Sequence, residues 1–219
     1  MAPAERVDTE VADGAEAGVD GISPRRRLLS AAVSCILERG YYRASSNEIA
    51  RRAGVSWGVI QYHYGSREEL LLAVFEDACQ QLLDHSRRGI IRGTTIREQL
   101  ASYFDYLLEF YGRPEYMAYV EISQNLARDP STSGKTLAAL RQLRDEFARQ
   151  GVVIPAITEP QRLLAFEAMQ GMILSHQLRT NDALTRALDS QSNFERRAQA
   201  LITALANYME NETAARPAE

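Results

Sequence analysis

Residues 45–67 read SSNEIARRAGVSWGVIQYHYGSR, and this stretch predicts two short helices joined by a tight turn. Ser45 and Glu48 have the spacing of a capping box, which starts a helix. Gly54 ends that helix because glycine adopts positive φ at little cost. Ser56 is placed to cap a second helix immediately afterwards. Two helices of about eight residues with so short a connection cross steeply, as in a helix-turn-helix.

The two sides of this motif differ in chemistry. Ala50 is expected near the closest approach of the two helices, with Val55 and Ile60 as the apolar underside of the second helix. The outer side carries Ser56, Trp57, Gly58, Gln61, Tyr62 and His63. Such groups can bond to phosphates or reach base edges from a helix in the major groove. We expect base contacts from Trp57, Gly58 and Gln61, and phosphate contacts from Ser45, Ser46, Ser56, Tyr62, His63 and Arg67.

The order of these residues resembles the DNA-binding end of the TetR family of bacterial transcription regulators. The pattern comprises Ile49-Ala50, Ala53-Gly54-Val55-Ser56, Gly58, Tyr62-His63-Tyr64 and Ser66-Arg67-Glu68-Glu69-Leu70. It spans roughly residues 26–75. Gln61 stands where the family commonly has a tyrosine, and Arg67 where a lysine is common. Arginine keeps the positive charge with a planar fork, whereas glutamine can read adenine.

The resemblance implies an all-α fold of about nine helices. A three-helix DNA-binding head is followed by a helical body that binds an effector and dimerises through its last two long helices. The predicted division is a disordered acidic tail over residues 1–22, the head over residues 23–67, and the body over residues 68–219.

Charge is distributed unevenly along the 219 residues. The formal net charge is −4, yet residues 24–67 hold eight arginines and two glutamates, whereas residues 1–23 hold one arginine and six acidic residues. Only the arginine-rich block should attract DNA. Arg25, Arg26 and Arg27 crowd the first turn of a helix, where the helix dipole disfavours cations. They therefore either reach a phosphate or the minor groove, or are simply solvated.

Several other classes of protein are disfavoured. Cys35 and Cys79 have no metal-ligand spacing and form no disulfide framework. His63, His85 and His176 lie on three different predicted helices, and the sequence has no zinc pair, phosphate loop or nucleophile elbow. We therefore expect no enzyme, no metal and no cofactor. The sequence shows neither a secretory signal nor a membrane span, which predicts a cytoplasmic location.

The body is predicted to consist of successive helices without strands. A helix from Ser66 to Arg88, about 33 Å long at 1.5 Å per residue, would couple the head to the body. Further helices are expected from Thr95 to Gly112, from Pro114 to Ala127, from Leu137 to Gly151, from Thr158 to Thr180, and from Ser192 onward.

Aromatic residues are concentrated in the body. Seven of the seventeen lie between Tyr103 and Tyr119, which indicates either a pocket for a flat or apolar effector or aromatic core packing. The predicted effector-binding residues are Tyr103, Tyr106, Leu107, Phe110, Tyr116, Tyr119, Phe147, Glu167, Gln170 and His176. A buried acid among them would favour a cationic effector, and a neutral effector would need only hydrogen bonds.

Small residues mark the predicted dimer interface. Ala165, Ala168, Gly171 and Ser175 form a ridge on one helix, and Leu201, Leu205 and Tyr208 recur at near-heptad spacing on the last. A two-fold copy would complete a four-helix bundle. The alternative is an intramolecular helical hairpin.

The sequence therefore predicts a homodimeric, ligand-responsive DNA-binding transcription regulator, most simply a repressor. Its partners would be a double-stranded pseudo-palindromic operator and a small, largely apolar or aromatic effector. The alternative is a DNA-binding dimer without a sensor, controlled by abundance or by a protein partner.

Overall fold

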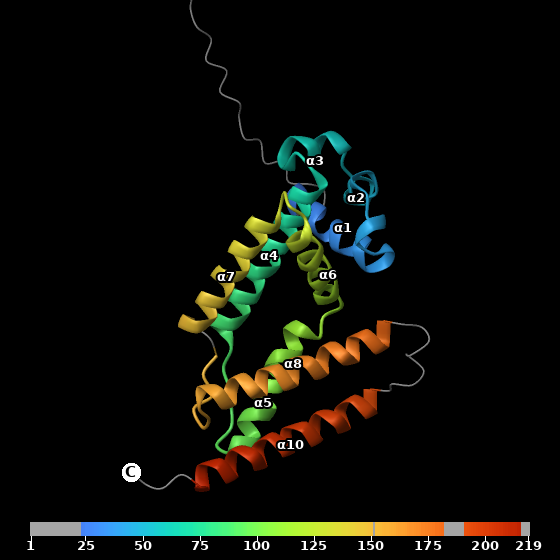
Figure 1. Cartoon of the computed structure of the whole chain (residues 1–219). Coiled ribbons are helices and arrows are strands. Elements are labelled where there is room, and N and C mark those ends of the chain that lie inside the picture. Colours follow the sequence, from blue (N-terminus) through green and yellow to red (C-terminus); the bar gives the residue numbers. More distant parts are fainter. Residues whose placement is uncertain (1–22, 151, 182–190, 216–219) are drawn as a thin grey trace, which may run out of the picture.

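The computed structural model describes residues 23–150, 152–181 and 191–215 (Figure 1). Within these ranges the chain forms nine α-helices, one short 3₁₀ helix and no strand, so the predicted all-α fold is confirmed. The helices are α1 (Pro24–Arg39), η1 (Tyr41–Arg43), α2 (Ser46–Ala53), α3 (Trp57–Tyr64), α4 (Arg67–Arg88), α5 (Ile96–Tyr111), α6 (Pro114–Arg128), α7 (Ser133–Gln150), α8 (Glu159–Asn181) and α10 (Gln191–Ala215). The predicted tail, residues 1–22, lies outside the described residues.

The head is built from α1, α2, α3 and the start of α4. Its core contains Leu28 and Ile36 from α1, Ile49 from α2, Ile60 from α3 and Leu70 from α4, and each is at most 1% exposed. Burial of apolar surface contributes roughly 25 cal/mol per Å². Apolar residues from all four helices therefore fix the outer surfaces of α2 and α3.

The turn between α2 and α3 has the predicted form. Gly54 adopts the left-handed conformation, with φ 68° and ψ 32°. The Val55 amide donates to the Ala50 carbonyl across the turn, at 3.0 Å. Ala50 is 2% exposed, which fits its expected place between the two helices. Of the tyrosine pair before α2, Tyr41 is buried in the head and Tyr42 is exposed.

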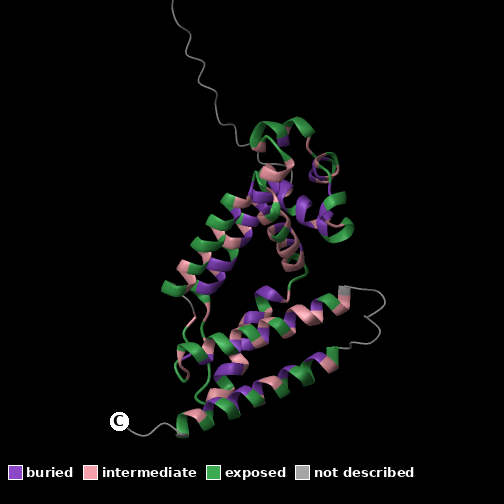
Figure 2. Ribbon diagram, in the orientation of Figure 1, coloured by how far each residue is buried: buried purple, intermediate pink, exposed green. Residues whose placement is uncertain are grey.

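The head core continues into α6. Ala118, Ile122 and Leu126 of α6 pack in the same cluster as the apolar residues of α1 to α4. A second cluster joins α5, α8 and α10 (Figure 2). The two hydrophobic clusters thus separate α6 from α5, and α6 packs with the head.

The long helix α4 runs from the head into the body. It has 22 residues and packs against α6 and α7. Ser66 caps its first turn by accepting from the Glu69 amide at 3.1 Å. The Glu69 carboxylate then pairs with Lys135 of α7 at 2.6 Å, so the capping serine has no reciprocal bond from Glu69. This pair ties the start of α4 to α7.

The two last helices lie side by side and cross α5 (Figure 1). α10 packs against both α5 and α8. It begins at Gln191, so the predicted cap Ser192 lies inside its first turn. α7 begins at Ser133, four residues before the predicted Leu137, because its polar first turn shows no apolar periodicity. Among the helices of the described residues, none has the length and apolar character needed to cross a membrane.

Candidate DNA-binding face and effector cavity

The outer side of α3 presents the predicted contact residues together. Ser56, Trp57, Gly58, Gln61, Tyr62 and His63 are all exposed. Trp57 is 49% exposed and Tyr62 is 81% exposed, whereas Ile60 on the opposite side is buried. A helix with large aromatic and amide side chains facing water on a rigid support can enter a groove of DNA.

The start of α3 is open to a ligand. Ser56 occupies the N-cap position, but its side chain bonds to no backbone amide of this helix. Gly58 follows in the first turn, where an added Cβ would meet only the Ser56 hydroxyl oxygen, at 3.5 Å. The first-turn amides of a helix carry partial positive charge and can bind a phosphate oxygen.

Part of the positive charge of the head is neutralised within the head. Arg52 bonds to Glu38 at 2.5 Å and to Glu48 at 3.0 Å, and Arg51 bonds to Glu48 at 2.8 Å. These hydrogen bonds, led by the one from Arg51, lower the pKa of Glu48 to about 2. Arg51 and Arg52 therefore link α2 internally and to α1, which leaves less of their charge for DNA.

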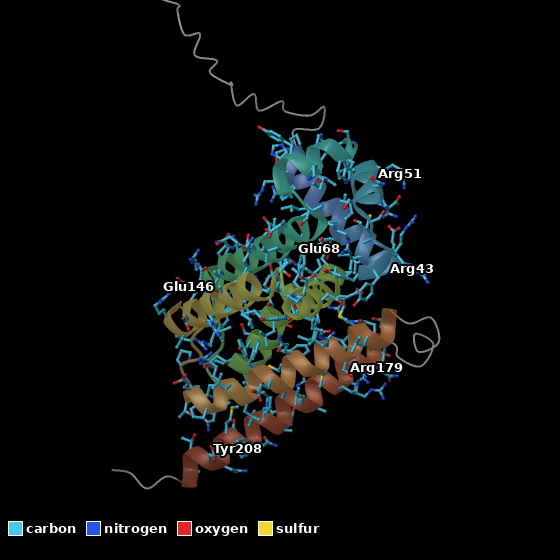
Figure 3. The ribbon with its side chains drawn as sticks, turned by 45° about the horizontal axis from the view of Figure 1, so that its top comes forward. Arg43, Arg51, Glu68, Glu146, Arg179 and Tyr208 are labelled. Atoms are coloured by element: carbon cyan, nitrogen blue, oxygen red, sulfur yellow. The ribbon has the colours of Figure 1, made fainter. Side chains whose placement is uncertain are left out.

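Other arginines lie at the edges of the head. Arg25 and Arg26 are exposed and Arg27 is half-buried, and Arg25 bonds to Tyr64 at the end of α3. Arg43 projects from the head next to the start of α2 (Figure 3). The sequence interpretation omitted Arg43, although its position two residues before the cap Ser45 was an available signal.

Arg67 is bonded within its own chain. Its Nε donates to the Ala44 carbonyl at 2.7 Å, its Nη2 donates to the Tyr41 carbonyl, and its Nη1 lies 3.3 Å from Glu68. The guanidinium also lies 4.4 Å from the centre of the Tyr41 ring, and the side chain is only 17% exposed. In the DNA-free chain this residue thus fastens the start of α4 to η1, and its contact with a phosphate stays a prediction.

The predicted effector residues divide between two neighbouring cavities. Tyr103, Tyr106, Leu107 and Phe147 line a cavity of about 380 Å³ between α5, α7 and α8. A smaller cavity of about 120 Å³, between α4, α5, α6 and α7, is lined by Phe110, Tyr116 and Tyr119. The aromatic residues between Tyr103 and Tyr119 therefore line cavities and also belong to the hydrophobic core.

The predicted polar anchors are mostly displaced from these cavities. Gln170 lies 3.4 Å from the Tyr116 hydroxyl, next to the smaller cavity. Glu167 is exposed, and His176 stacks on Phe194 at 4.1 Å. Neither residue lines either of these cavities, so their role at an effector site stays a prediction. Arg144, Glu159 and Arg162 line the larger cavity instead.

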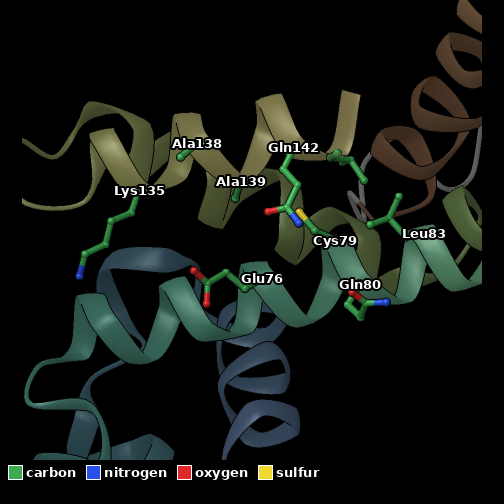
Figure 4. A pocket seen from close by; sticks show the side chains of 9 residues that line it. Glu76, Cys79, Gln80, Leu83, Lys135, Ala138, Ala139 and Gln142 are labelled. Atoms are coloured by element: carbon green, nitrogen blue, oxygen red, sulfur yellow. The ribbon is translucent and has the colours of Figure 1, made fainter. Parts of the chain in front are cut away.

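A third hollow, of about 410 Å³, lies between α4 and α7. Figure 4 shows Glu76 and Cys79 on α4 facing Lys135, Ala139 and Gln142 on α7. Its lining includes the polar side chains of Glu76, Gln80 and Gln142. It lacks the aromatic walls of the cavity beside α5, which is therefore the better candidate for an apolar effector.

The predicted dimer residues also fall on two sides of their helices. Ala165 and Leu205 are buried within this chain, with 0% and 7% exposure, so their assignment to an interface is corrected. Ala165 shares the inner side of α8 with Met169 and Ile173, four and eight residues later. Gly171 and Tyr208 are exposed, and Ala168, Ser175 and Leu201 are half-buried. Small residues occur on both sides of α8, so composition alone did not identify the outer one.

A helix-turn-helix head with an exposed second helix, carried on a helical body, defines a class of DNA-binding proteins. Residues 28–74 match the family model described as "Bacterial regulatory proteins, tetR family". The head is therefore a TetR-family domain, and the resemblance found in the sequence is confirmed.

Curated relatives match the same end of the chain. The "Fatty acid metabolism regulator protein" of Bacillus subtilis is 31% identical over 75 residues, which are 34% of this chain and 39% of the relative. The "HTH-type transcriptional activator FasR" of Mycolicibacterium smegmatis is 36% identical over 86 residues, 39% of each chain. The chain thus spans about two fifths of the length of these relatives.

Solved structures match nearly the whole fold. A transcriptional regulator from Rhodococcus sp. Rha1 covers 84% of this chain and 96% of its own, with a TM-score of 0.61 and 21% identity. The regulator FadR from Bacillus subtilis, solved in complex with stearoyl-CoA, covers 82% of this chain and 96% of its own, with a TM-score of 0.51 and 16% identity. At these identities the likeness concerns the fold alone.

Proposed function

We propose that the protein is a homodimeric transcription regulator that binds a pseudo-palindromic operator and is released from it by a small effector. The observation that carries the proposal is the exposed side of α3 on a tightly packed TetR-family head. Each subunit would place α3 in a major groove, with the two half-sites one helical turn apart or more. The basic block of the head supports this orientation on DNA.

The outer sides of α8 and α10 support the homodimer. Leu164, Ala168, Gly171, Ser175 and Leu178 follow one another at spacings of three and four residues on α8, and Leu164 and Leu178 are 43% and 59% exposed. Tyr208 of α10 is 47% exposed. Such an apolar stripe with small residues at its centre fits a second copy of the same helix pair.

The cavity beside α5 supports an effector. A regulator without a sensor, the alternative function, would be expected to fill this region with packed side chains, whereas the chain leaves about 380 Å³ there. The FadR structure, similar in fold, was solved in complex with stearoyl-CoA, so this fold can accommodate a small-molecule ligand. Release from DNA would require the effector to favour one spacing of the two heads over the other.

DNA selection with the purified full-length protein tests the proposal. Fragments retained from random genomic DNA should share a pseudo-palindrome and bind as a complex containing two chains. A protein that is monomeric at micromolar concentration, or that retains no common sequence, would refute the proposed function.

A matched pair of glycine variants tests the assignment of α3. Gly58→Glu places a carboxylate on the exposed first turn of α3, where a Cβ meets only the Ser56 hydroxyl oxygen. We expect it to weaken operator binding by more than about 100-fold, because like charges brought together cost several kcal/mol. Gly134→Glu makes the same charge change in open space on α7 and should leave binding within about threefold. Equal loss in both variants would contradict the assignment.

A further inference from the structure

The cavity beside α5 has flat aromatic walls. The rings of Tyr103 and Tyr106 are 6.0 Å apart and within 12° of parallel, and the Tyr106 ring stacks on His85 at 4.4 Å and 8°. Phe166 of α8 adds a ring 5.9 Å from that of Tyr111. Tyr103 and Tyr106 of α5 are thus nearly parallel, and rigid aromatic rings of this kind suit a flat ligand better than a flexible one.

Three phenol hydroxyls open onto this cavity. Within the part of the chain that the structure describes, the hydroxyls of Tyr103, Tyr106 and Tyr111 have no hydrogen-bond partner. All three tyrosines line the cavity. Three phenol groups without a partner in this chain can bond to a polar group of a ligand.

These hydroxyls keep their protons at neutral pH. Burial raises the pKa of Tyr103 to about 12, and the neighbouring positive charge of Arg162 lowers it only in part. Burial also raises the pKa of Tyr106, and it raises the pKa of Tyr111 well above its usual value. Each phenol can therefore donate a hydrogen bond to an anionic oxygen.

Arg162 places a positive charge at the same cavity. It is half-buried in the first turn of α8, where the helix dipole does not favour a cation. No acidic partner lies within ion-pair distance of its guanidinium among the described residues. Arg144, on the opposite helix α7, is instead paired with Asp145 at 2.7 Å. Glu159 lies on the exposed rim, where water screens its charge.

We propose that this cavity binds a flat, apolar monoanion, an aromatic or polycyclic carboxylate. Its carboxylate would lie against Arg162 and the tyrosine hydroxyls, and its rings would lie along Tyr103 and Tyr106. A guanidinium fork and phenol donors match the acceptor geometry of a carboxylate, while the remaining lining is apolar. The inference deepens the proposed function, on which it rests, by naming the chemical class of the effector.

The charges at the cavity disfavour both a cationic and a neutral effector. A cationic effector would need a buried acid, but Glu159 is exposed on the rim and Glu167 points away from the cavity. A neutral effector would leave the Arg162 charge against an apolar wall without an anion. The monoanion is the class that uses both the charge and the hydroxyls.

Calorimetric titration of the DNA-free protein with three compounds tests the class. Naphthoate is the flat anion, naphthamide its neutral isostere, and decanoate a flexible anion. We expect naphthoate to bind at least about tenfold more tightly than either of the others, since one charge-assisted pair is worth about 1.4 kcal/mol or more. Absence of naphthoate binding, equal binding of the amide, or tighter binding of decanoate would each overturn the proposal.

Variants of the cavity arginines locate the anion. Arg162→Gln should weaken naphthoate binding about tenfold and leave naphthamide unchanged, while Arg162→Lys should retain most of the naphthoate affinity. Arg144→Gln, the same charge change at an arginine already paired with Asp145, should alter binding less than about threefold. Equal losses for acid and amide would place the anion elsewhere and refute the Arg162 assignment. A protein that selects an operator but fails these titrations would retain the proposed function and lose only the effector class.

Discussion

Removal of the Arg67 guanidinium should reveal its contribution to the head. We expect Arg67→Ala to lower the free energy of unfolding by about 1–3 kcal/mol, because the carbonyls of Tyr41 and Ala44 lose a charged donor in a partly buried place. Urea unfolding followed by circular dichroism measures this change. We expect the slope of log affinity against log salt to change by less than one unit, since the guanidinium is already engaged within the chain.

Arg51→Ala is the matched control for this variant. Arg51 is also an arginine of the head with a glutamate partner, but its side chain is 68% exposed. Its loss should cost less than about 1 kcal/mol, as for most surface pairs. If Arg67→Ala leaves the stability unchanged and reduces the salt slope by about one unit, Arg67 is a phosphate contact after all.

Gln61 is the residue best placed to read a base. It is exposed in the middle of α3, and its amide can bond to adenine in two places. Gln61→Ala should cost about 1–3 kcal/mol on the selected operator and relax the preference at one or two base pairs. Competition among operators with single base-pair changes measures the preference. A uniform loss over all of them would instead assign Gln61 to the DNA backbone.

At the scale of the elements, α6 links the head to the body. The Glu121 carboxylate accepts from the Tyr41 backbone amide at 2.7 Å, so α6 satisfies a donor at the start of η1. Tyr116 and Tyr119 of the same helix line the smaller cavity. A displacement of α6 would therefore change its contact with η1 in the head as well as the lining of the smaller cavity in the body.

Glu121→Ala should loosen the start of η1. The Tyr41 amide would lose its acceptor in a partly buried place, and we expect faster hydrogen exchange at this amide together with a loss of about 1–3 kcal/mol in stability. Gln124→Ala, at an exposed position on the same helix, should change neither quantity appreciably. Unaltered exchange at Tyr41 in the Glu121 variant would show that the contact does not hold η1.

Helix starts were predictable from the sequence where a cap precedes apolar periodicity. Ser45, Ser66 and Thr95 each cap the helix that follows them, and Thr95 with Glu98 forms the complete reciprocal box. The Ser45 box is half formed because the Glu48 carboxylate bonds to arginines instead. Side-chain competition of this kind depends on tertiary neighbours, which local spacing does not reveal.

At the scale of the whole molecule, dimerisation is the property that DNA binding by two heads requires. Gly171 lies at the centre of the exposed stripe of α8, and an added Cβ there meets nothing of its own chain within 4 Å. Gly171→Leu should therefore leave the subunit folded, separate the dimer and abolish operator binding. Analytical ultracentrifugation with a parallel DNA-binding assay measures both effects.

Gly134→Leu is the control for the dimer variant. Gly134 is also a helical glycine in open space, but it lies on α7, away from α8 and α10. The control should remain dimeric and bind the operator. A Gly171→Leu protein that sediments as a dimer would place the interface on another surface.

The sequence predicted the head more completely than the body. In the head, side chains cap α1 and α2, glycines end α1, α2 and α3, and the outer residues Trp57 and Tyr62 are exposed as the helical period requires. In the body, α8 is apolar around most of its circumference, so periodicity could not separate the inner Ala165 from the outer Gly171. The cavity arginine Arg162 was missed because nothing local distinguishes it from a solvated charge. Its role depends on the packing of α5 and α7 around it.

The shared core of α1, α2 and α6 restricts how this protein can be divided. A fragment that ends at Arg67 would expose the apolar sides of Ile36 and Leu29 to water, because Ile122 and its neighbours would be missing. A chimaera that transfers this DNA specificity to another regulator must therefore carry α4 and α6 with the reading helix. The segment that must be exchanged is the one that shares this hydrophobic core. It extends well beyond the residues that contact the operator.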